Sequence, residues 1–351
     1  MLAPVLHVLP LATITRERVL PVAGKISAHL NQRVSATDVI GEANYAREHV
    51  LIDVARTFNV STKAADRMIK VNERDRVTQG ALVAERAGII PRSIRAPRAG
   101  RVMVAGGGQV LMEVGDTKIE LRAGLPGVVT QVIPDLGVVI RTSGALIQGV
   151  WGNGRIDSGL MVSLVEKPDD VLTPERLDVS LRGSVILGGN VRDADTLRAA
   201  AELPVRGLIL ASLLSPLLQQ AYQMRYPILV LEGFGAMPMN SAAFKLLTTN
   251  NKREATVNAE HFDRYRGSRP EVIIPLPVSS EPAEPEDFTS FRAGQTVRMR
   301  RPPNAGMIGT ITSLRAGRSE LPSGVRASAA DVKLENGDAM LVPLVNLEVV
   351  G

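Results

Sequence analysis

An internal repeat near the N-terminus constrains the fold of this chain more than any other feature. Residues 33–42 read Arg-Val-Ser, a gap, then Val-Ile-Gly-Glu, and residues 76–85 read Arg-Val-Thr, an equal gap, then Leu-Val-Ala-Glu. A third, partial copy at 142–147 matches 78–83. Each copy predicts a short strand, a turn and another strand within about a dozen residues. The N-terminal zone is therefore expected to be a compact β unit that folds back on itself repeatedly.

A second signature lies between the repeats. Residues 21–26 and 97–102 share the pattern P-x-x-G-x-[IV], with Gly24 and Gly100 at the glycine position. Glycine adopts positive φ without a steric penalty, so we expect these two residues at tight turns.

The repeats and this signature resemble the barrel-sandwich hybrid, or hammerhead, fold of biotinyl and lipoyl domains. Similar modules also occur in large subunits of RNA polymerase and in subunits of sodium-pumping and Rnf-type electron-transport complexes. The resemblance covers roughly residues 20–150. Carrier domains of this family present a lysine between two methionines, whereas Met103 and Met112 have no lysine beside them. The resemblance thus implies the fold without covalent biotin or lipoate.

Residues 42–71 form a predicted helical insert. Apolar positions recur at three- and four-residue steps, which predicts one buried helix face: Ala46, Val50, Val54 and Phe58, with His49 beside them. Ser61 can cap a second helix over 62–70. The segment resembles a DNA-binding helix-turn-helix, which would place Lys63 and Arg67 against DNA. The alternative, which we favour, is a helical pair packed on the β zone.

Strands and helices alternate from Gly183 to about residue 278. Apolar runs predict strands at 184–187, 207–211 and 227–231, each followed by a helix, at 194–203, 214–224 and 240–248. Three consecutive strand–helix units imply a parallel sheet. Ligands gather beyond the carboxyl ends of such strands, so the candidate pocket comprises Gly188, Gly189, Asn190, Glu232, Gly233 and Gly235. The alternative is that these glycines only allow the turns, since no GxGxxG or GxxxxGK[ST] motif is present.

The C-terminal part follows an acidic, proline-bearing stretch, 279–287, which reads as a linker. Val297, Gly306, Gly309 and Ile311 have the spacing of the KOW motif, so the segment resembles the SH3-like barrels of NusG-type factors and ribosomal proteins. Asn336-Gly337 predicts a type I′ hairpin.

The KOW resemblance implies a binding face for nucleic acid or a partner, made of Arg298, Arg300, Arg301, Gly306 and Gly309. Phosphate contact there would depend on salt. The alternative, a solvated barrel face that binds protein, carries equal weight.

A second basic cluster lies at Arg92, Arg95, Arg98 and Arg101, and no acidic residue occurs from 87 to 112. In an extended loop these side chains would form a ribbon that attracts anions. The simpler interpretation, which we favour, is that arginine is the general surface cation of this chain.

The amino-acid composition excludes several kinds of functional site. The 351 residues contain no cysteine and four histidines without metal-ligand spacing, so thiolate and disulfide chemistry is excluded and no metal or cofactor is expected. No apolar run is long enough for a membrane helix. The net charge of +5 is modest, and 3% aromatic residues argue against a base-stacking platform. No signal-peptide pattern is seen, so a cytoplasmic location is expected.

Together these patterns predict a multidomain α+β chain: a barrel-sandwich-like β domain (1–160) with the helical insert, an α/β domain (161–278), the linker, and an SH3-like barrel (288–351). The expected function is non-catalytic: an interaction or scaffold protein that binds a partner protein or large complex, with RNA or DNA as an open alternative. The competing hypotheses are a small-molecule-binding or enzymatic α/β protein and a structural subunit of an electron-transport-type complex.

Overall fold

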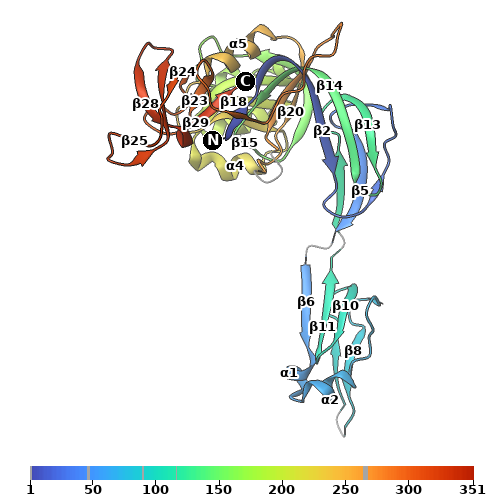
Figure 1. Cartoon of the computed structure of the whole chain (residues 1–351). Helices are drawn as coiled ribbons and strands as arrows, with labels where there is room; N and C mark the ends of the chain where they lie inside the picture. The colour runs from blue at the N-terminus through green and yellow to red at the C-terminus, as the bar shows by residue number, and fades with distance from the viewer. Residues whose placement is uncertain (1, 46–47, 89–90, 116, 264–267) are drawn as a thin grey trace.

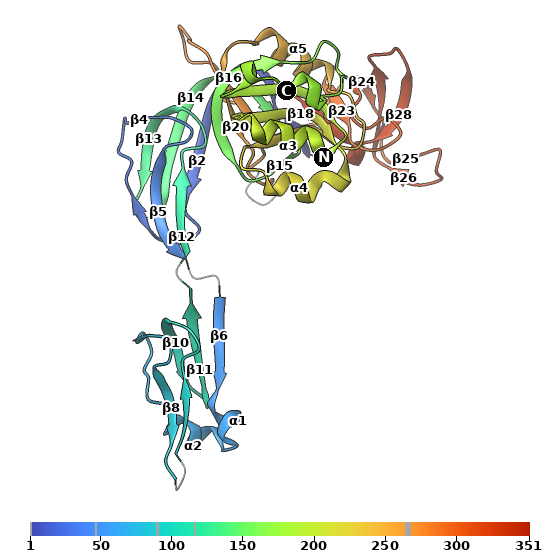
Figure 2. The same cartoon turned by 180° about the vertical axis from the view of Figure 1, so that it is seen from behind.

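The computed structural model describes residues 2–45, 48–88, 91–115, 117–263 and 268–351, which form an elongated molecule (Figure 1). Strands hold 48% of the chain and helices 13%, in agreement with a β-rich α+β fold. Three units pack into a body, and a fourth unit, residues 48–114, stands at the far end of strands β5 (Val39–Tyr45) and β12 (Thr117–Arg122), as Figures 1 and 2 show. We call residues 48–114 the distal unit.

The first β unit in the body is built from segments on both sides of the distal unit. Besides β5 and β12, its strands are β2 (Val8–Val19), β3 (Lys25–Ile26), β4 (Arg33–Val34), β13 (Gly127–Ile133) and β14 (Gly137–Gln148). Strands β3, β5 and β12 form one small sheet, while β4, β13, β14 and β2 belong to the large central sheet. Apolar side chains between them, such as Ile14, Ile40 and Ile140, form a buried core.

The distal unit has a core of its own, drawn wholly from residues 50 to 114. Its elements are β6 (Glu48–Asp53), α1 (Val54–Phe58), α2 (Thr62–Asp66), β7 (Arg76–Val77), β8 (Leu82–Arg86), β9 (Arg92–Arg95), β10 (Gly100–Gly106) and β11 (Gln109–Val114). Strands β6, β11, β10 and β7 form a sheet in that order, and β8 pairs with β9.

The expectation of a helical insert over 42–71 is wrong for most of its length. Residues 42–45 belong to β5, and 48–53 form β6, in which Ile52 is buried and Leu51 is exposed. The helices α1 and α2 have only five residues each. The three- and four-residue spacing of apolar residues arose because a strand runs directly into a short helix. These helices are too short to serve as the helix pair of a DNA-binding helix-turn-helix.

The distal unit repeats the strand pairing of the first β unit. The pair Ile26 and Gly41 has its counterpart in Ile69 and Ala84, each 43 residues further along the chain. Strand pairs β4–β13, β5–β12 and β13–β14 correspond to β7–β10, β8–β9 and β10–β11. The repeat seen in the sequence therefore reflects two copies of one β unit.

Backbone hydrogen bonds confirm the correspondence of the two copies. Val129 bonds through its carbonyl and N–H to the backbones of Asn31 and Gln32 (2.8 and 2.9 Å), and Val102 bonds in the same way to Arg74 and Asp75 (2.7 and 2.9 Å). One copy is inserted into the other. In the first β unit, the chain between the paired strands β5 and β12 forms the whole distal unit. In the distal unit, the corresponding strands β8 and β9 are joined by a short hairpin loop instead.

The repeat glycines serve a purpose other than the expected one. Neither Gly24 nor Gly100 has positive φ. Instead, a Cβ on Gly100 would lie 2.2 Å from the Glu113 carbonyl oxygen, and one on Gly24 would lie 2.4 Å from that of Glu42. Gly100 and Gly127 occupy the same position in the two copies, and a Cβ added to Gly127 would lie 2.3 Å from the Arg141 carbonyl oxygen. The third sequence copy, 142–147, lies inside β14 and is not a strand–turn–strand unit.

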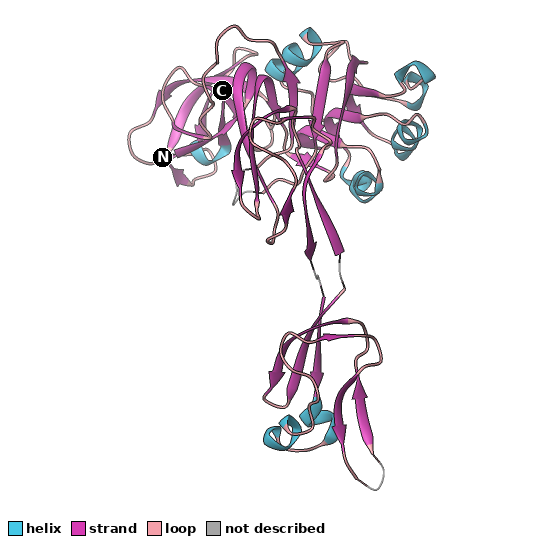
Figure 3. Cartoon of the chain, turned by 90° about the vertical axis from the view of Figure 1, so that its right-hand side faces the viewer, coloured by secondary structure: helices cyan, strands magenta, loops and turns pink. Residues whose placement is uncertain are grey.

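The α/β unit contains the parallel sheet expected from the alternating pattern. Strands β16 (Ile156–Ser163), β17 (Ser184–Val191), β18 (Gly207–Leu213) and β19 (Ile228–Phe234) are parallel neighbours. Helices α3 (Ala194–Glu202) and α4 (Leu218–Gln223) pack in the core on one face, and α5 (Ser241–Thr249) packs in the core on the other. The remaining elements are β15 (Trp151–Gly152), β20 (Glu254–Asn258), β21 (Glu271–Pro275), η1 (Pro174–Arg176), η2 (Val179–Leu181) and η3 (Ser215–Leu217). Figure 3 shows these few helices beside the strands.

The C-terminal β unit takes a strand from the other end of the chain. Its elements are β22 (Phe288–Ser290), β23 (Thr296–Met299), β24 (Ile308–Leu314), β25 (Ser319–Glu320), β26 (Arg326–Ala327), β27 (Ala329–Leu334), β28 (Ala339–Pro343), η4 (Leu344–Asn346) and β29 (Leu347–Val350). Strand β1 (Leu2–Leu6) lies between β22 and β29 and is parallel to β29. Ala3 and Val5 of β1 are part of the same core, so this unit needs both ends of the chain.

Two local expectations about the C-terminal part are refined. The β27–β28 hairpin forms, but only Gly337 of the Asn336-Gly337 pair has positive φ, so the turn is not type I′. Residues 279–287 contain no helix or strand, yet they lie along β2: Thr13 Oγ1 donates to the Pro282 carbonyl (2.6 Å), and Arg141 pairs with Glu281 (3.0 Å). Hydrogen bonds and ion pairs thus fix the expected linker to the first β unit.

Candidate functional site

Four charged side chains form a buried chain of ion pairs where the C-terminal β unit meets the α/β unit. Arg298, on β23, places Nη1 2.9 Å from Glu232 Oε2 and Nη2 3.1 Å from Glu348 Oε2. Arg269, just before β21, places Nη2 2.7 Å from Glu348 Oε1. The side chains of Glu232, Arg298 and Glu348 are at most 6% exposed. Because one arginine joins two carboxylates from different units, the network fixes their relative position.

Backbone and amide groups complete most of the bonding of this network. Glu232 Oε1 accepts hydrogen bonds from the Asn240 backbone N–H (2.9 Å) and from Asn240 Nδ2 (2.5 Å). The Asn240 side chain also caps α5 by accepting from the Ala243 N–H (2.8 Å). Arg298 Nη1 additionally donates to the Leu231 carbonyl (3.2 Å). The Nε–H of Arg298 is buried and has no partner, although buried polar groups are normally paired.

A cavity of about 440 Å³ lies against this network, a size within the usual range for small-molecule pockets. We call it the junction cavity. One side is formed by the end of β19 and the residues after it, including Phe234, and the other by the 300–306 segment of the C-terminal unit. Phe262 and Arg269 complete the wall, with the Arg269 guanidinium 5.2 Å from the centre of the Phe262 ring. That distance is typical of a cation–π contact.

The residues predicted from the KOW resemblance divide into different environments. Arg298 faces the α/β unit, where its side chain is buried and forms ion pairs with Glu232 and Glu348. It is therefore not part of an exposed phosphate-binding face. Arg300 and Arg301 are exposed, and Arg300 lines the junction cavity with Gly306. Gly309 is buried, and a Cβ there would lie 2.8 Å from the Lys333 carbonyl oxygen, which gives it a packing role.

The candidate pocket at the strand ends is closed over one of its halves. A Cβ on Gly188 would lie 2.8 Å from Leu172 Cδ2, and one on Gly189 2.4 Å from the Asp170 carbonyl oxygen. Asn190 Nδ2 donates to the Asp169 carbonyl (3.0 Å), so the segment before β17 covers this end.

The other half of that pocket is open. Glu232 and Gly233 line the junction cavity, whereas Gly235, at φ +119°, has open space where a Cβ would stand and does not line it. The two sets of residues that the sequence treats as separate sites therefore meet in one cavity, through Glu232 and Gly233 from one set and Arg298, Arg300 and Gly306 from the other.

The four arginines of the second basic cluster are exposed but do not form one ribbon. Arg92 and Arg95 lie on β9, and Arg95 Nη1 donates to the Gly80 carbonyl (2.9 Å). Arg98 is paired with Glu48. Arg101 lies on β10 between Arg76 and Glu113 of the neighbouring strands. The simpler interpretation, ordinary surface arginines, agrees with this placement.

The distal unit carries a partly exposed apolar row that sequence reasoning missed. Leu51, Leu111 and Val104 are cross-strand neighbours on β6, β11 and β10, and Leu51 is 57% and Val104 48% exposed. They lie on the sheet face opposite the core residues Ile52, Val110 and Val102. We call these three residues the apolar row. The sequence signal for this row was the alternation of polar and apolar residues over 48–53, which is typical of a strand. The prediction of a helix there hid this signal.

An aromatic cluster was also missed. The Trp151 ring lies 5.0 Å from the Tyr222 ring and 6.0 Å from the Phe234 ring, both edge-on. Trp151 Nε1 donates to the Tyr222 hydroxyl (3.1 Å). These residues come from β15, α4 and β19, so no local pattern in the sequence groups them. Through Phe234 the cluster borders the junction cavity.

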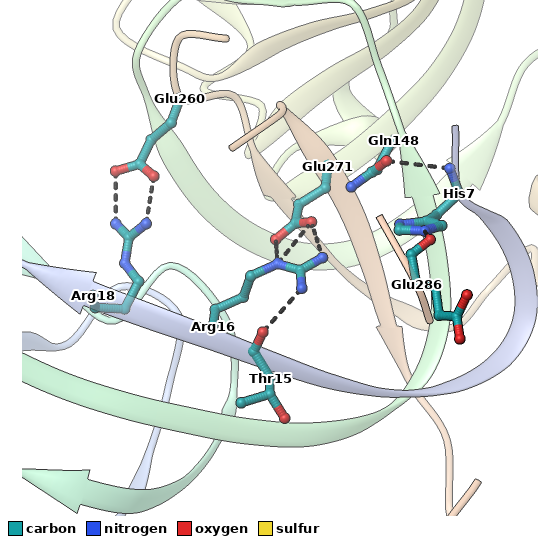
Figure 4. A network of polar contacts seen from close by, with 8 residues as sticks. All are labelled: His7, Thr15, Arg16, Arg18, Gln148, Glu260, Glu271 and Glu286. Carbon is teal, nitrogen blue, oxygen red and sulfur yellow. Dashed lines mark hydrogen bonds and ion pairs between the residues drawn. The ribbon is translucent and has the colours of Figure 1, made fainter. Parts of the chain in front are cut away.

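A polar seam joins β2 to the α/β unit (Figure 4). Arg16 makes a two-point contact with Glu271 (closest 2.8 Å), and Arg18 makes one with Glu260 (2.5 and 2.6 Å). Burial favours the neutral form of Glu260, yet the hydrogen bonds and charge of Arg18 hold the pKa of Glu260 below its usual value. Burial lowers the pKa of His7, whose Nε2 lies 3.2 Å from the Glu286 carbonyl.

Comparison of the chain with protein-family models and with curated proteins finds no match. Within the described residues, no group of three or more histidine, aspartate or glutamate side chains is arranged to hold a metal ion. The helices found there are also too short or too polar to cross a membrane. The candidate sites therefore stand on their own geometry.

Proposed function

We propose that this protein is a non-catalytic interaction protein whose distal unit binds a partner protein. The observation that carries the proposal is the apolar row on a sheet at the far end of the molecule (Figure 2), in which the exposed Leu51 and Val104 flank the half-buried Leu111. Exposed neighbouring apolar side chains on a β surface are typical of a protein contact.

The construction of the distal unit supports this role. Its core contains residues 50–114 alone, so the unit can keep its shape independently of the body. The next row of the same face carries Arg76, Arg101, Glu113 and His49. A few apolar anchors with a polar, charged surround match the usual anatomy of a protein interface.

A protein partner fits this face better than a nucleic acid. The only phenylalanine, tyrosine or tryptophan between 48 and 114 is Phe58, which is buried, so the exposed imidazole of His49 is the only ring in this sequence range on which a base could stack. Two of the four arginines in the basic cluster bond within the unit, Arg98 to Glu48 and Arg95 to Gly80. The buried position of Arg298 removes one residue from the proposed nucleic-acid face of the C-terminal unit.

The test is a reversible cross-linking and co-purification experiment on the tagged full-length chain in extract of its native cells. Proteins recovered with the wild type are identified, purified and titrated against the chain directly. Leu51→Asp and Val104→Asp should each weaken that binding about tenfold or more, because each places a charge in the centre of the contact.

Val325→Asp is the matched control, since Val325 is 58% exposed in the C-terminal unit and should leave affinity unchanged. Binding that survives both changes in the distal unit would reject the proposed surface. Recovery of nucleic acid instead, with an affinity that falls steeply with salt, would favour the alternative partner class.

A further inference from the structure

We propose that the junction cavity binds a small organic anion that carries a flat ring. The cavity is lined by residues of the body, whereas the apolar row belongs to the distal unit, so this site is separate from the proposed partner surface. Figure 1 shows the distal unit standing apart from the body. Its volume of about 440 Å³ suits a metabolite-sized molecule rather than a peptide or a nucleic-acid strand.

The charges around the cavity favour an anion. Both carboxylates are already occupied: Glu232 by Arg298 and Asn240, and Glu348 by Arg298 and Arg269. Among the described residues that line the cavity, three guanidiniums against two carboxylates leave one positive charge. That charge belongs to Arg300, which lines the cavity, is exposed, and has no ion-pair partner among the described residues. Arginine is the side chain best suited to two-point contacts with phosphate or carboxylate.

A second observation also points to a missing partner. Arg298 is 94% buried as a side chain and lines the cavity, and its Nε–H is unpaired while its other nitrogens are bonded. A buried donor without a partner is unfavourable, because it has lost its hydrogen bond to water and gained none in exchange. An acceptor brought into the cavity, with a small adjustment of the guanidinium, would satisfy this group.

The aromatic residues in the cavity wall are the reason for proposing a ligand with a flat ring. Phe234 and Phe262 both line the cavity and are 40% and 46% exposed, although large aromatic side chains are usually well covered. The Phe262 ring lies under Arg269 at a cation–π distance, and Phe234 remains 40% exposed beside its edge contact with Trp151. Offset or edge contact with a ligand ring would cover it.

The protein contains its own reporter for this site. Trp151 is the only tryptophan, and its ring lies 6.0 Å from Phe234, so occupation of the cavity should change its fluorescence. The probes are adenosine monophosphate and benzoate, which combine a ring with a phosphate or a carboxylate. Adenosine and inorganic phosphate supply the ring and the anion separately. Titration calorimetry on the full chain provides a second readout that does not depend on fluorescence.

At least one ring-bearing anion should bind saturably, and about tenfold or more tighter than adenosine or phosphate. Arg300→Ala should weaken that binding by a similar factor, because among the described residues that line the cavity it removes the guanidinium that has no ion-pair partner. Arg301→Ala is the matched control: it removes the adjacent exposed arginine, which does not line the cavity, and should bind as the wild type does. Equal unfolding temperatures would show that both variants are folded.

Three results would overturn the proposal. The first is no saturable binding of either anion by calorimetry, and the second is equal binding of adenosine. The third is equal loss of binding in the Arg300 and Arg301 variants, which would indicate general attraction to a basic surface.

Discussion

Arg298 lies 2.9 Å from Glu232, although 66 residues separate them in sequence and they belong to different units. Their side chains are almost wholly buried, and the second carboxylate on Arg298, Glu348, comes from a strand of its own unit. The pairing makes the C-terminal unit and the α/β unit one body. It also removes the arginine from the surface on which the KOW resemblance would place it.

Glu232→Gln should lower the free energy of unfolding by about 3 kcal/mol, because Arg298 would keep its buried charge with one partner fewer. Chemical denaturation with Trp151 fluorescence as the signal measures this. Glu320→Gln, an exposed glutamate in β25, is the control and should change stability by less than about 0.5 kcal/mol. An unchanged midpoint for Glu232→Gln would contradict the structural role given to the pair.

The two copies of the β unit should respond separately to glycine substitution. Gly100→Ala should destabilise the distal unit by about 1–3 kcal/mol, because the new Cβ would lie 2.2 Å from the Glu113 carbonyl oxygen. Gly127→Ala should do the same to the first β unit. Amide hydrogen exchange followed by fragment analysis would show faster exchange in 48–114 for the first variant only. Equal effects of both variants across the whole chain would argue against two separate cores.

Strand β1 should be necessary for the C-terminal unit. Ala3 is fully buried in that core and Leu2 is 70% exposed, so Ala3→Asp should destabilise the unit by about 3 kcal/mol or more while Leu2→Asp is tolerated. Hydrogen exchange of β29, the parallel partner of β1, is the measurement. Similar protection in the two variants would mean that β1 contributes little.

His7 should give stability a pH dependence. Burial lowers its pKa below the ordinary value of 6.5, so the unfolded chain binds the proton more readily than the folded one. Stability is then complete above about pH 6.5 and declines as the pH falls toward the folded-state pKa. His7→Gln should flatten this part of the profile, whereas His29→Gln, at an exposed position, should not. A profile that is the same in all three proteins would contradict the assignment.

The sequence indicated the fold well where the signal is local. Apolar runs such as 184–187, which glycines end and a helix follows, predicted the parallel strands. The helix after that run, α3, is capped by Asp193, which accepts from the Thr196 N–H. The offset of the repeat also proved to be structural, since Ile26 and Ile69 occupy the same position in their copies. These features depend on neighbouring residues only.

The features of the fold and of the candidate site that the sequence did not predict depend on contacts between segments far apart in the chain. Nothing near Arg298 shows that it will be buried against Glu232, and nothing near Met1 shows that β1 will lie beside β29. The distal unit was mistaken for a helical insert because the alternation of Glu48–Asp53 is short and runs into a helix. The candidate site residues lie in two different units, and only the folded chain brings Glu232 and Gly233 to the same cavity as Arg298, Arg300 and Gly306.

Because one copy is inserted within the other, a further folded unit could be inserted at the corresponding position of the distal unit. Because the β8–β9 hairpin takes the place at which the distal unit itself emerges from the first copy, a further folded unit could be spliced there without disturbing any core. Insertions at such exposed hairpins are usually well tolerated. The same hairpin is therefore a natural attachment point for a labelled domain that would measure how far the distal unit reaches from the body.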